Sequence, residues 1–286
     1  MIGDPGAPDA LALHVDLHAH STASDGSQAP AAAVEAAHKA GLAAFALTDH
    51  DTLAGIPEAQ EAADHLGIRL VPGVELSVHQ GTVEVHLLGL HIRDVAVLQQ
   101  RLEAIRDQRR TRAIEIVARL NAVGVPLAVD AVLAAAAGGA IGRPHVAKAL
   151  IAGGFVKDSR EAFDRYLAAG KPAYVEKERL EVADGIRLIH EAGGIAVVAH
   201  PGPDGRRERV EPLVALGLDG LEVRHPSHSG EDTKRIAALA EHFHLVPSGG
   251  SDWHGAMFGG RVLGALQVPM AWLEAQDARV ARVRAG

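Results

Sequence analysis

The chain has 286 residues, enough to bury a sizeable core in one large domain or two small ones. It contains no cysteine, which excludes disulfides and thiolate metal sites, and no apolar run approaches the length of a membrane span. The formal net charge of −8 disfavours a protein that coats nucleic acid. Its 17 histidines outnumber its five phenylalanines, two tryptophans and two tyrosines combined, a balance that points to metal chemistry.

The start of the chain predicts no regular element. Residues 1–10 include Gly3, Pro5, Gly6 and Pro8 and are expected to form a loose tail. They lack a basic segment followed by an apolar one, so no signal peptide is expected, and the cytoplasm is the favoured compartment.

The first chemically suggestive stretch runs from Val15 to Gly26. It begins as an apolar strand in which His18 and His20, two residues apart, would face the same side. Asp25 follows in a polar turn that Gly26 allows. Two imidazoles and a carboxylate make half of a divalent-metal site. A pair of surface histidines in a loop is the simpler alternative.

The same pattern of an apolar strand with ionisable residues at its end recurs along the chain. Helices are predicted from the cap at Ser27 to just before Gly41 and over residues 57–66. The further predicted strands, each with its ionisable residues, are Leu42–Leu47 with His50, Ile68–Val74 with Glu75, Val83–Leu90 with His86, Gly194–Ala199 with His200, Asp219–Val223 with His225, and His244–Ser248 with Asp252 and His254.

Nearly all of the seven predicted strands therefore have ionisable residues at or beyond their carboxyl ends. Helical patterns separate most of them, as parallel strand connections require. In parallel α/β barrels the active site lies at that face. We therefore expect an α/β fold, a βα barrel of about seven units.

A helical insertion is expected at residues 95–180, where the strand pattern is absent. Residues 95–124 have the spacing of one long helix with Leu98, Leu102, Ile105, Ile114, Val117 and Leu120 on its apolar face. Shorter helices are expected near residues 129–137, 144–152 and 159–169. The arginines of the long helix are most simply its solvated face, with nucleic-acid binding as the alternative; they are Arg101, Arg106, Arg109, Arg110, Arg112 and Arg119.

Nine residues are candidate metal ligands. They are His18, His20, Asp25, His50, Glu75, His86, His200, Asp252 and His254. All offer nitrogen or oxygen donors, which suit manganese, iron or zinc. Because nine ligands exceed what one ion can use, two or three divalent ions are expected, with Glu75 and Asp252 able to bridge them. Such a cluster favours hydrolysis of phosphate esters.

The motif order HxH…DG, TDHD, GVE, HLLG, AHP and GSDWH resembles that of the PHP (polymerase and histidinol phosphatase) family, from His18 to His254. The resemblance implies a distorted (β/α)7 barrel of the PHP type with a trinuclear metal site, in which all nine candidate ligands have matches and manganese is the favoured metal. The barrel is expected at residues 11–94 and 181–286, with the helical insertion at 95–180 as a substrate lid over its mouth.

The insertion resembles that of one subgroup of this family, through Gly142–Ala147, Tyr166-Leu167 and Gly170–Val175. That subgroup contains 3′,5′-nucleoside bisphosphate phosphatases, which also act as 5′-to-3′ exonucleases on short RNA. The resemblance therefore implies a metal-dependent phosphoesterase acting on a small nucleotide or short RNA. The acidic net charge and the lack of a long apolar run lead us to expect no duplex and no membrane partner. Histidinol phosphate phosphatase and a non-catalytic PHP interaction module are the alternatives.

The resemblance also implies roles for individual residues. Glu75, Asp252 and His254 are expected to serve the chemical step as well as to bind metal. Expected substrate contacts are Arg143, His145, Lys171, His225 and His228. Two alternatives remain open: Arg143 as a residue that caps or pairs at a helix start, and the last two histidines as ordinary loop residues. Arg224-His225-Pro226 stands where the subgroup often has small residues, so this pocket wall could differ.

Overall fold

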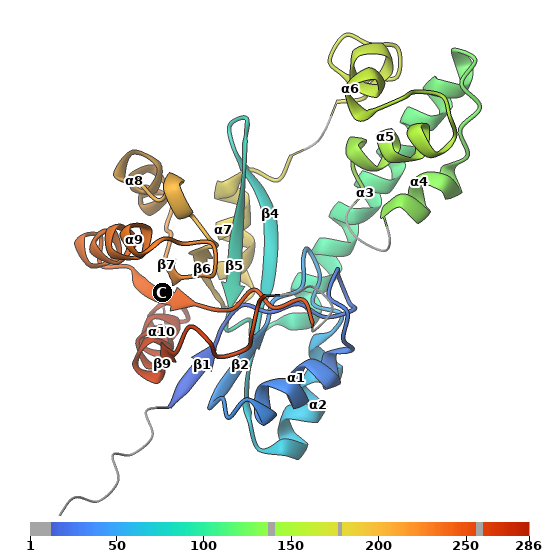
Figure 1. Cartoon of the computed structure of the whole chain (residues 1–286). Coiled ribbons are helices and arrows are strands. Elements are labelled where there is room, and N and C mark those ends of the chain that lie inside the picture. Colours follow the sequence, from blue (N-terminus) through green and yellow to red (C-terminus); the bar gives the residue numbers. More distant parts are fainter. Residues whose placement is uncertain (1–12, 137–140, 177–178, 256–259, 286) are drawn as a thin grey trace, which may run out of the picture.

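The computed structural model describes residues 13–136, 141–176, 179–255 and 260–285, which form a mixed α/β fold (Figure 1). A four-stranded sheet has the order β3-β2-β1-β9. Its strands are β1 (His14–Asp16), β2 (Ala44–Leu47), β3 (Arg69–Pro72) and β9 (Val268–Pro269). The first three are parallel, and the short β9 runs antiparallel to β1.

A five-stranded sheet has the order β4-β5-β6-β7-β8. Its strands are β4 (Val74–Gln80), β5 (Val83–Leu90), β6 (Ile195–Val198), β7 (Gly220–Arg224) and β8 (Val246–Gly249). β5 runs antiparallel to both β4 and β6, whereas β6, β7 and β8 are parallel. The β4–β5 hairpin, turning at Gly81 with φ 64°, projects beyond the other strands in Figure 1.

The expected third strand, Ile68–Val74, is divided in the structure. The chain leaves the first sheet after β3 and enters the second at β4, so Glu75 lies inside a strand and not beyond the end of one. Gly73 permits this crossing, because a Cβ there would lie 2.8 Å from Cγ2 of Thr48 and 3.1 Å from the Gly89 carbonyl oxygen. β4 and β5 thus depart from the parallel βα barrel that the sequence predicted, because β5 runs antiparallel to both of its neighbours.

The two sheets approach each other but do not form a closed ring. Isolated bridges join Ala19 to Trp253 and His50 to Glu75. The Leu17 amide also donates to the Gly249 carbonyl, 3.1 Å away. The ends of β1, β2, β4 and β8 consequently meet in one region.

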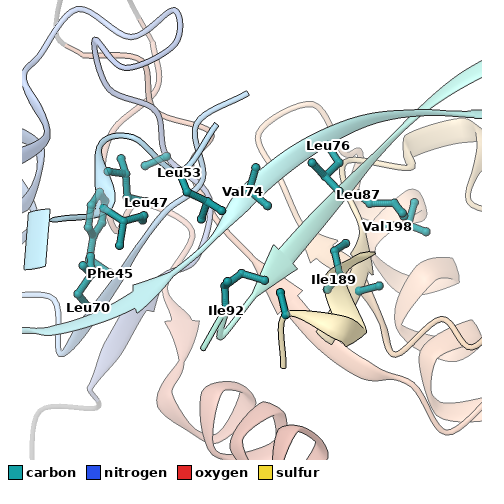
Figure 2. Packing of buried hydrophobic residues seen from close by; sticks show 14 of the residues in the cluster. Phe45, Leu47, Leu53, Leu70, Val74, Leu76, Leu87, Ile92, Ile189 and Val198 are labelled. Atoms are coloured by element: carbon teal, nitrogen blue, oxygen red, sulfur yellow. The ribbon is translucent and has the colours of Figure 1, made fainter. Parts of the chain in front are cut away.

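Helices cover the sheets. They are α1 (Pro30–Lys39), α2 (Ile56–Leu66), α7 (Val182–Glu191), α8 (Arg207–Ala215), α9 (Gly230–His242) and α10 (Met270–Val283), with a 3-10 turn at Gly202–Asp204. In Figure 2 the core runs from Phe45 and Leu47, past Val74, to Leu87 and Val198. Within the described residues, no helix is both long enough and apolar enough to cross a membrane.

The helices of the insertion gather around the far end of a single long helix, away from the strands (Figure 1). They are α3 (Val95–Ala122), α4 (Val129–Ala136), α5 (Arg143–Ala152) and α6 (Ser159–Ala162), with a π-helical turn at Phe163–Leu167. Leu98 and Leu102 pack into the core of the main body, whereas Val117 and Leu120 belong to a separate apolar cluster. Ile114 was expected on the apolar face but is 44% exposed.

Candidate metal centre

His18 and His20 are carried by the chain just beyond β1. Both side chains are fully buried, and their ring centroids lie 5.2 Å apart. The His20 amide donates to the Trp253 carbonyl at 2.8 Å, and the Asp252 amide donates to the His18 carbonyl at 2.8 Å. The motif near the start of the chain is thus fixed against the motif after β8.

Glu75 lies at the centre of five imidazoles. Its Oε2 is 3.1 Å from His18 Nε2, 3.2 Å from His20 Nε2 and 3.3 Å from His50 Nδ1. Its Oε1 is 2.8 Å from His86 Nδ1 and 2.9 Å from His200 Nε2. Burial alone would raise the pKa of the Glu75 carboxyl, but His18 and the other imidazoles hold it well below its usual value. The Glu75 carboxyl is therefore ionised among the histidines that surround it.

Two aspartates complete the cluster. Asp252 Oδ1 lies 3.1 Å from His20 Nε2 and 3.6 Å from His254 Nδ1. Asp25 Oδ1 lies 3.4 Å from His254 Nε2, and its Oδ2 lies 3.8 Å from His50 Nε2. All nine predicted ligands therefore converge.

The donor set fits divalent metal ions. Four groups of at least three residues each bring their donor atoms within 4.8 Å of one another: His20, Asp25, His50 and His254; His18, His20, Glu75 and Asp252; His18, Glu222 and His225; and His50, Glu75 and His86. Among the described residues, neither buried ring nitrogen of His20 makes a hydrogen bond, although Nε2 lies 3.1 Å from Asp252 Oδ1 and 3.2 Å from Glu75 Oε2. Because an unsatisfied buried polar atom is costly, a metal ion explains this arrangement.

Glu222, which the sequence reasoning did not single out, is fully buried beneath His18. Its Oε1 is 2.9 Å from His18 Nδ1, and its Oε2 accepts a hydrogen bond from the His200 amide at 2.5 Å. The sequence marks it only as a carboxylate inside the apolar strand β7, which does not show what it faces.

The structure places His225 at the metal cluster. It is buried, and its Nε2 lies 3.2 Å from Asp252 Oδ2 while its Nδ1 is hydrogen-bonded to the Ser227 hydroxyl. Arg261 also contacts Asp252 Oδ2. His228 donates from Nδ1 to the Val223 carbonyl and accepts at Nε2 from the Gly202 amide, which leaves neither nitrogen for a phosphate.

A cavity of about 450 Å³ lies between the β4–β5 hairpin and the insertion. Its walls include four arginines and one glutamate: Arg109, Arg112, Arg143, Arg179 and Glu84. Ser77, also in this wall, pairs with His86 in the β4–β5 ladder, so the cavity adjoins the metal cluster. Of the expected phosphate contacts, Arg143 and His145 line the cavity, whereas Lys171 is exposed and does not.

Several arginines of the long helix pair with other parts of the chain and do not form the solvated face that was expected. Arg109 is nearly buried and paired with Asp51. Arg112 donates to the carbonyls of Val175 and Glu176, whereas Arg119, which donates to the Tyr174 carbonyl, is still 44% exposed. Burial, and then the charge of nearby Arg143, lower the pKa of Arg112. The packing of α3 against the main body and the returning chain covers positions that helical periodicity alone assigns to solvent.

Comparisons with known proteins agree with this geometry. The family model of the PHP domain matches residues 16–179. A 5′-3′ exoribonuclease of Haemophilus influenzae is 39% identical over 84% of this chain and 89% of its own length. A 3′,5′-nucleoside bisphosphate phosphatase of Chromobacterium violaceum is 39% identical over 88% of this chain and 90% of its own length. A solved structure from Bifidobacterium adolescentis, assigned as a metal-dependent phosphoesterase, has a TM-score of 0.70 at 33% identity and covers 96% of this chain and 98% of that one.

Proposed function

The chain belongs to the PHP domain family, and from this premise we propose that it removes a phosphate from nucleoside 3′,5′-bisphosphates and from the 5′ ends of short RNA. The observation that carries the proposal is the adjacency of two regions suited to bind phosphate. One is the metal cluster around Glu75, and the other is the arginine-lined cavity beside it. A substrate with two phosphates on one ribose fills both.

The cluster would hold two or three divalent ions, with manganese favoured and iron or zinc as alternatives, through the nine predicted ligands, of which His200 adjoins the others through Glu75. When bound, such ions polarise a phosphoryl oxygen and activate water. Glu75 and Asp252 present carboxylates toward several imidazoles each, the placement that a bridging ligand needs. Glu222 would orient His18, and His225 would orient Asp252.

The arginine-lined cavity would bind the phosphate that is not cleaved. Four arginines face one glutamate in its wall, so the cavity carries an excess of positive charge. Arg143 has a guanidinium that can grip phosphate through two nitrogens, and its stacking against Phe163 and Tyr174 holds that group in place. A bound remote phosphate would keep the scissile one in reacting geometry, which raises the rate as well as the affinity.

The organisation of the chain follows from this function. Residues 11–94 and 181–286 would form the metal-binding part, a distorted barrel whose two sheets stay open, and residues 95–180 would be the substrate lid. Arg143 and His145 then come from the lid, whereas the metal ligands come from the barrel.

An assay with three substrates distinguishes the candidates. Purified protein loaded with manganese is tested against adenosine 3′,5′-bisphosphate, a short 5′-phosphorylated RNA and histidinol phosphate. We expect the first two to be hydrolysed far faster, because histidinol phosphate has one phosphate and a cationic amine that the arginines repel. Preferred hydrolysis of histidinol phosphate would favour that alternative, and no hydrolysis of any substrate would favour a non-catalytic module.

A further inference from the structure

A buried ion pair joins the long helix α3 to the loop that follows β2. Arg109 Nη1 donates to Asp51 Oδ2 over 2.7 Å. The two side chains are only 12% and 7% exposed. Because removing one partner of a buried pair leaves an uncompensated charge, this contact fixes the helix to the loop.

Asp51 is bound just as firmly on its other side, to the strand that carries Glu75. Its amide donates to the Glu75 carbonyl at 2.9 Å, and its Oδ1 accepts from the Ser77 amide at 2.9 Å. Its φ of 50° is in the left-handed region, which a non-glycine residue adopts only when its surroundings hold it there. Asp51 thus lies between α3 and the centre of the metal cluster, directly after His50.

Arg109 also faces the arginine-lined cavity. Among the residues that the structure describes, only its Nη1 has a hydrogen-bond partner, so Nε and Nη2 remain available to an anion there. Three residues later on the helix, Arg112 holds the carbonyls of Val175 and Glu176 on the returning segment of the insertion. One short stretch of α3 therefore contacts the metal-site loop, the cavity and the lid.

We propose that Arg109 is a positioning residue, which acts through Asp51 to fix the cavity relative to His50 and Glu75. This inference rests on the proposed function, because it concerns how a phosphate in the cavity places a second phosphate at the metal cluster. A fixed separation between the two regions turns binding of the remote phosphate into a rate advantage. Loss of the pair lets the lid shift, so the substrate still binds but reacts from a poorer geometry.

The test is a double-mutant cycle on the manganese-loaded enzyme with adenosine 3′,5′-bisphosphate. Asp51→Asn keeps an oxygen for the Ser77 amide but removes the charge that Arg109 faces. We expect Asp51→Asn and Arg109→Gln each to lower kcat by about 10- to 100-fold, and the double variant to be no worse than Arg109→Gln. In Asp51→Asn, KM should stay near that of the wild type, because Asp51 is not in the cavity wall. Arg110→Gln, at an exposed neighbour on the same helix, is the matched control and should leave kcat unchanged.

Two readouts separate positioning from folding. Metal content should match the wild type in Asp51→Asn, whereas its melting temperature should fall because Arg109 loses its buried partner. The metal-free variant, still folded, should bind adenosine 3′,5′-bisphosphate with unchanged affinity in calorimetry. Arg109→Lys keeps the charge but not the geometry, so it should lose kcat with little change in KM. A wild-type kcat in Asp51→Asn, additive losses in the double variant, or loss of metal together with kcat would overturn the inference. The proposed function fails separately, if the wild-type enzyme does not prefer the bisphosphate.

Discussion

His18 and Glu222 lie 204 residues apart in the chain, yet His18 Nδ1 is 2.9 Å from Glu222 Oε1 and both side chains are fully buried. The other ring nitrogen of His18, Nε2, lies 3.1 Å from Glu75. Glu222 therefore holds the proton on Nδ1 and directs Nε2 toward the cluster. This carboxylate–imidazole arrangement is typical of metal ligands in proteins.

Replacement of Glu222 by glutamine keeps the size of the side chain but removes the charge that orients His18. We expect Glu222→Gln to weaken metal binding or activity by about 10- to 100-fold. Metal titration of chelated protein measures the affinity, and Glu211→Gln, at an exposed glutamate of α8, is the matched control. An unchanged affinity and turnover would mean that Glu222 has no influence on the cluster.

Much of the fold is predictable from the sequence, because strand ends and helix caps leave local signals. The strand Val83–Leu90 has the predicted bounds, and α2 ends before Gly67, whose φ of 69° suits glycine. Apolar periodicity does not reveal strand direction, so the antiparallel pairing of β5 with β4 and β6 was missed. The division at Gly73 was missed too, because only the tertiary approach of Thr48 and Gly89 shows why glycine is required there.

A substitution of Asp252 tests the metal cluster itself. Asp252→Asn keeps the side chain's size but removes a carboxylate that approaches His18, His20 and His254. Turnover should fall by more than about 100-fold, beyond the typical effect of residues that only orient ligands. Near-normal turnover would remove Asp252 from the ligand set, and Asp64→Asn, an exposed aspartate of α2, is the control.

The number of ions is measured by elemental analysis of carefully prepared wild-type protein. We expect two to three transition-metal ions per chain, and removal by chelator should abolish activity. At most one ion per chain would contradict a multinuclear cluster.

Arg143 tests the cavity. One lost charge-assisted contact costs on the order of 1.5–3 kcal/mol, so Arg143→Ala should lower kcat/KM for adenosine 3′,5′-bisphosphate by about 10- to 150-fold. A small generic phosphate ester, which does not reach the cavity, should lose much less. Lys171→Ala should have a smaller effect, because Lys171 is outside the cavity wall. Equal losses on both substrates would assign Arg143 to the chemical step or to folding.

His91, which lies outside the metal cluster, makes the free energy of unfolding depend on pH. Burial lowers the pKa of His91 from 6.5 to about 4, although Gln276 and Asp277 oppose the shift. Below pH 6.5 His91 binds a proton in the unfolded chain but not in the folded chain. The free energy of unfolding therefore decreases as the pH falls from about 6.5 toward about 4. Between about pH 7 and about pH 5 this loss is about 2 kcal/mol.

The variant His91→Asn should show a smaller acid-dependent loss. Asparagine tolerates the φ of 58° at this position but does not titrate. Urea unfolding of metal-free wild-type and variant protein at the two pH values measures the difference. An identical pH dependence in the two proteins would contradict the assignment.

The convergence of the nine candidate ligands was predictable, because most of them fall in short motifs that follow apolar strands, although Glu75 and His86 lie within strands. Glu222 and Arg109 were not. A lone carboxylate in an apolar strand gives no indication of what it faces, and helical periodicity does not say which arginine another element will cover. Tertiary packing supplies both answers, through His18 for Glu222 and through Asp51 for Arg109.

The central claim is that one substrate occupies the metal cluster and the arginine-lined cavity together. The most direct test is the ratio of kcat/KM for adenosine 3′,5′-bisphosphate to that for adenosine 5′-monophosphate, measured on the same manganese-loaded preparation. The second phosphate gains at least one charge-assisted contact worth on the order of 1.5–3 kcal/mol, so the ratio should exceed about 10. Comparable kcat/KM for the two nucleotides would show that the second phosphate is not recognised and would contradict the account.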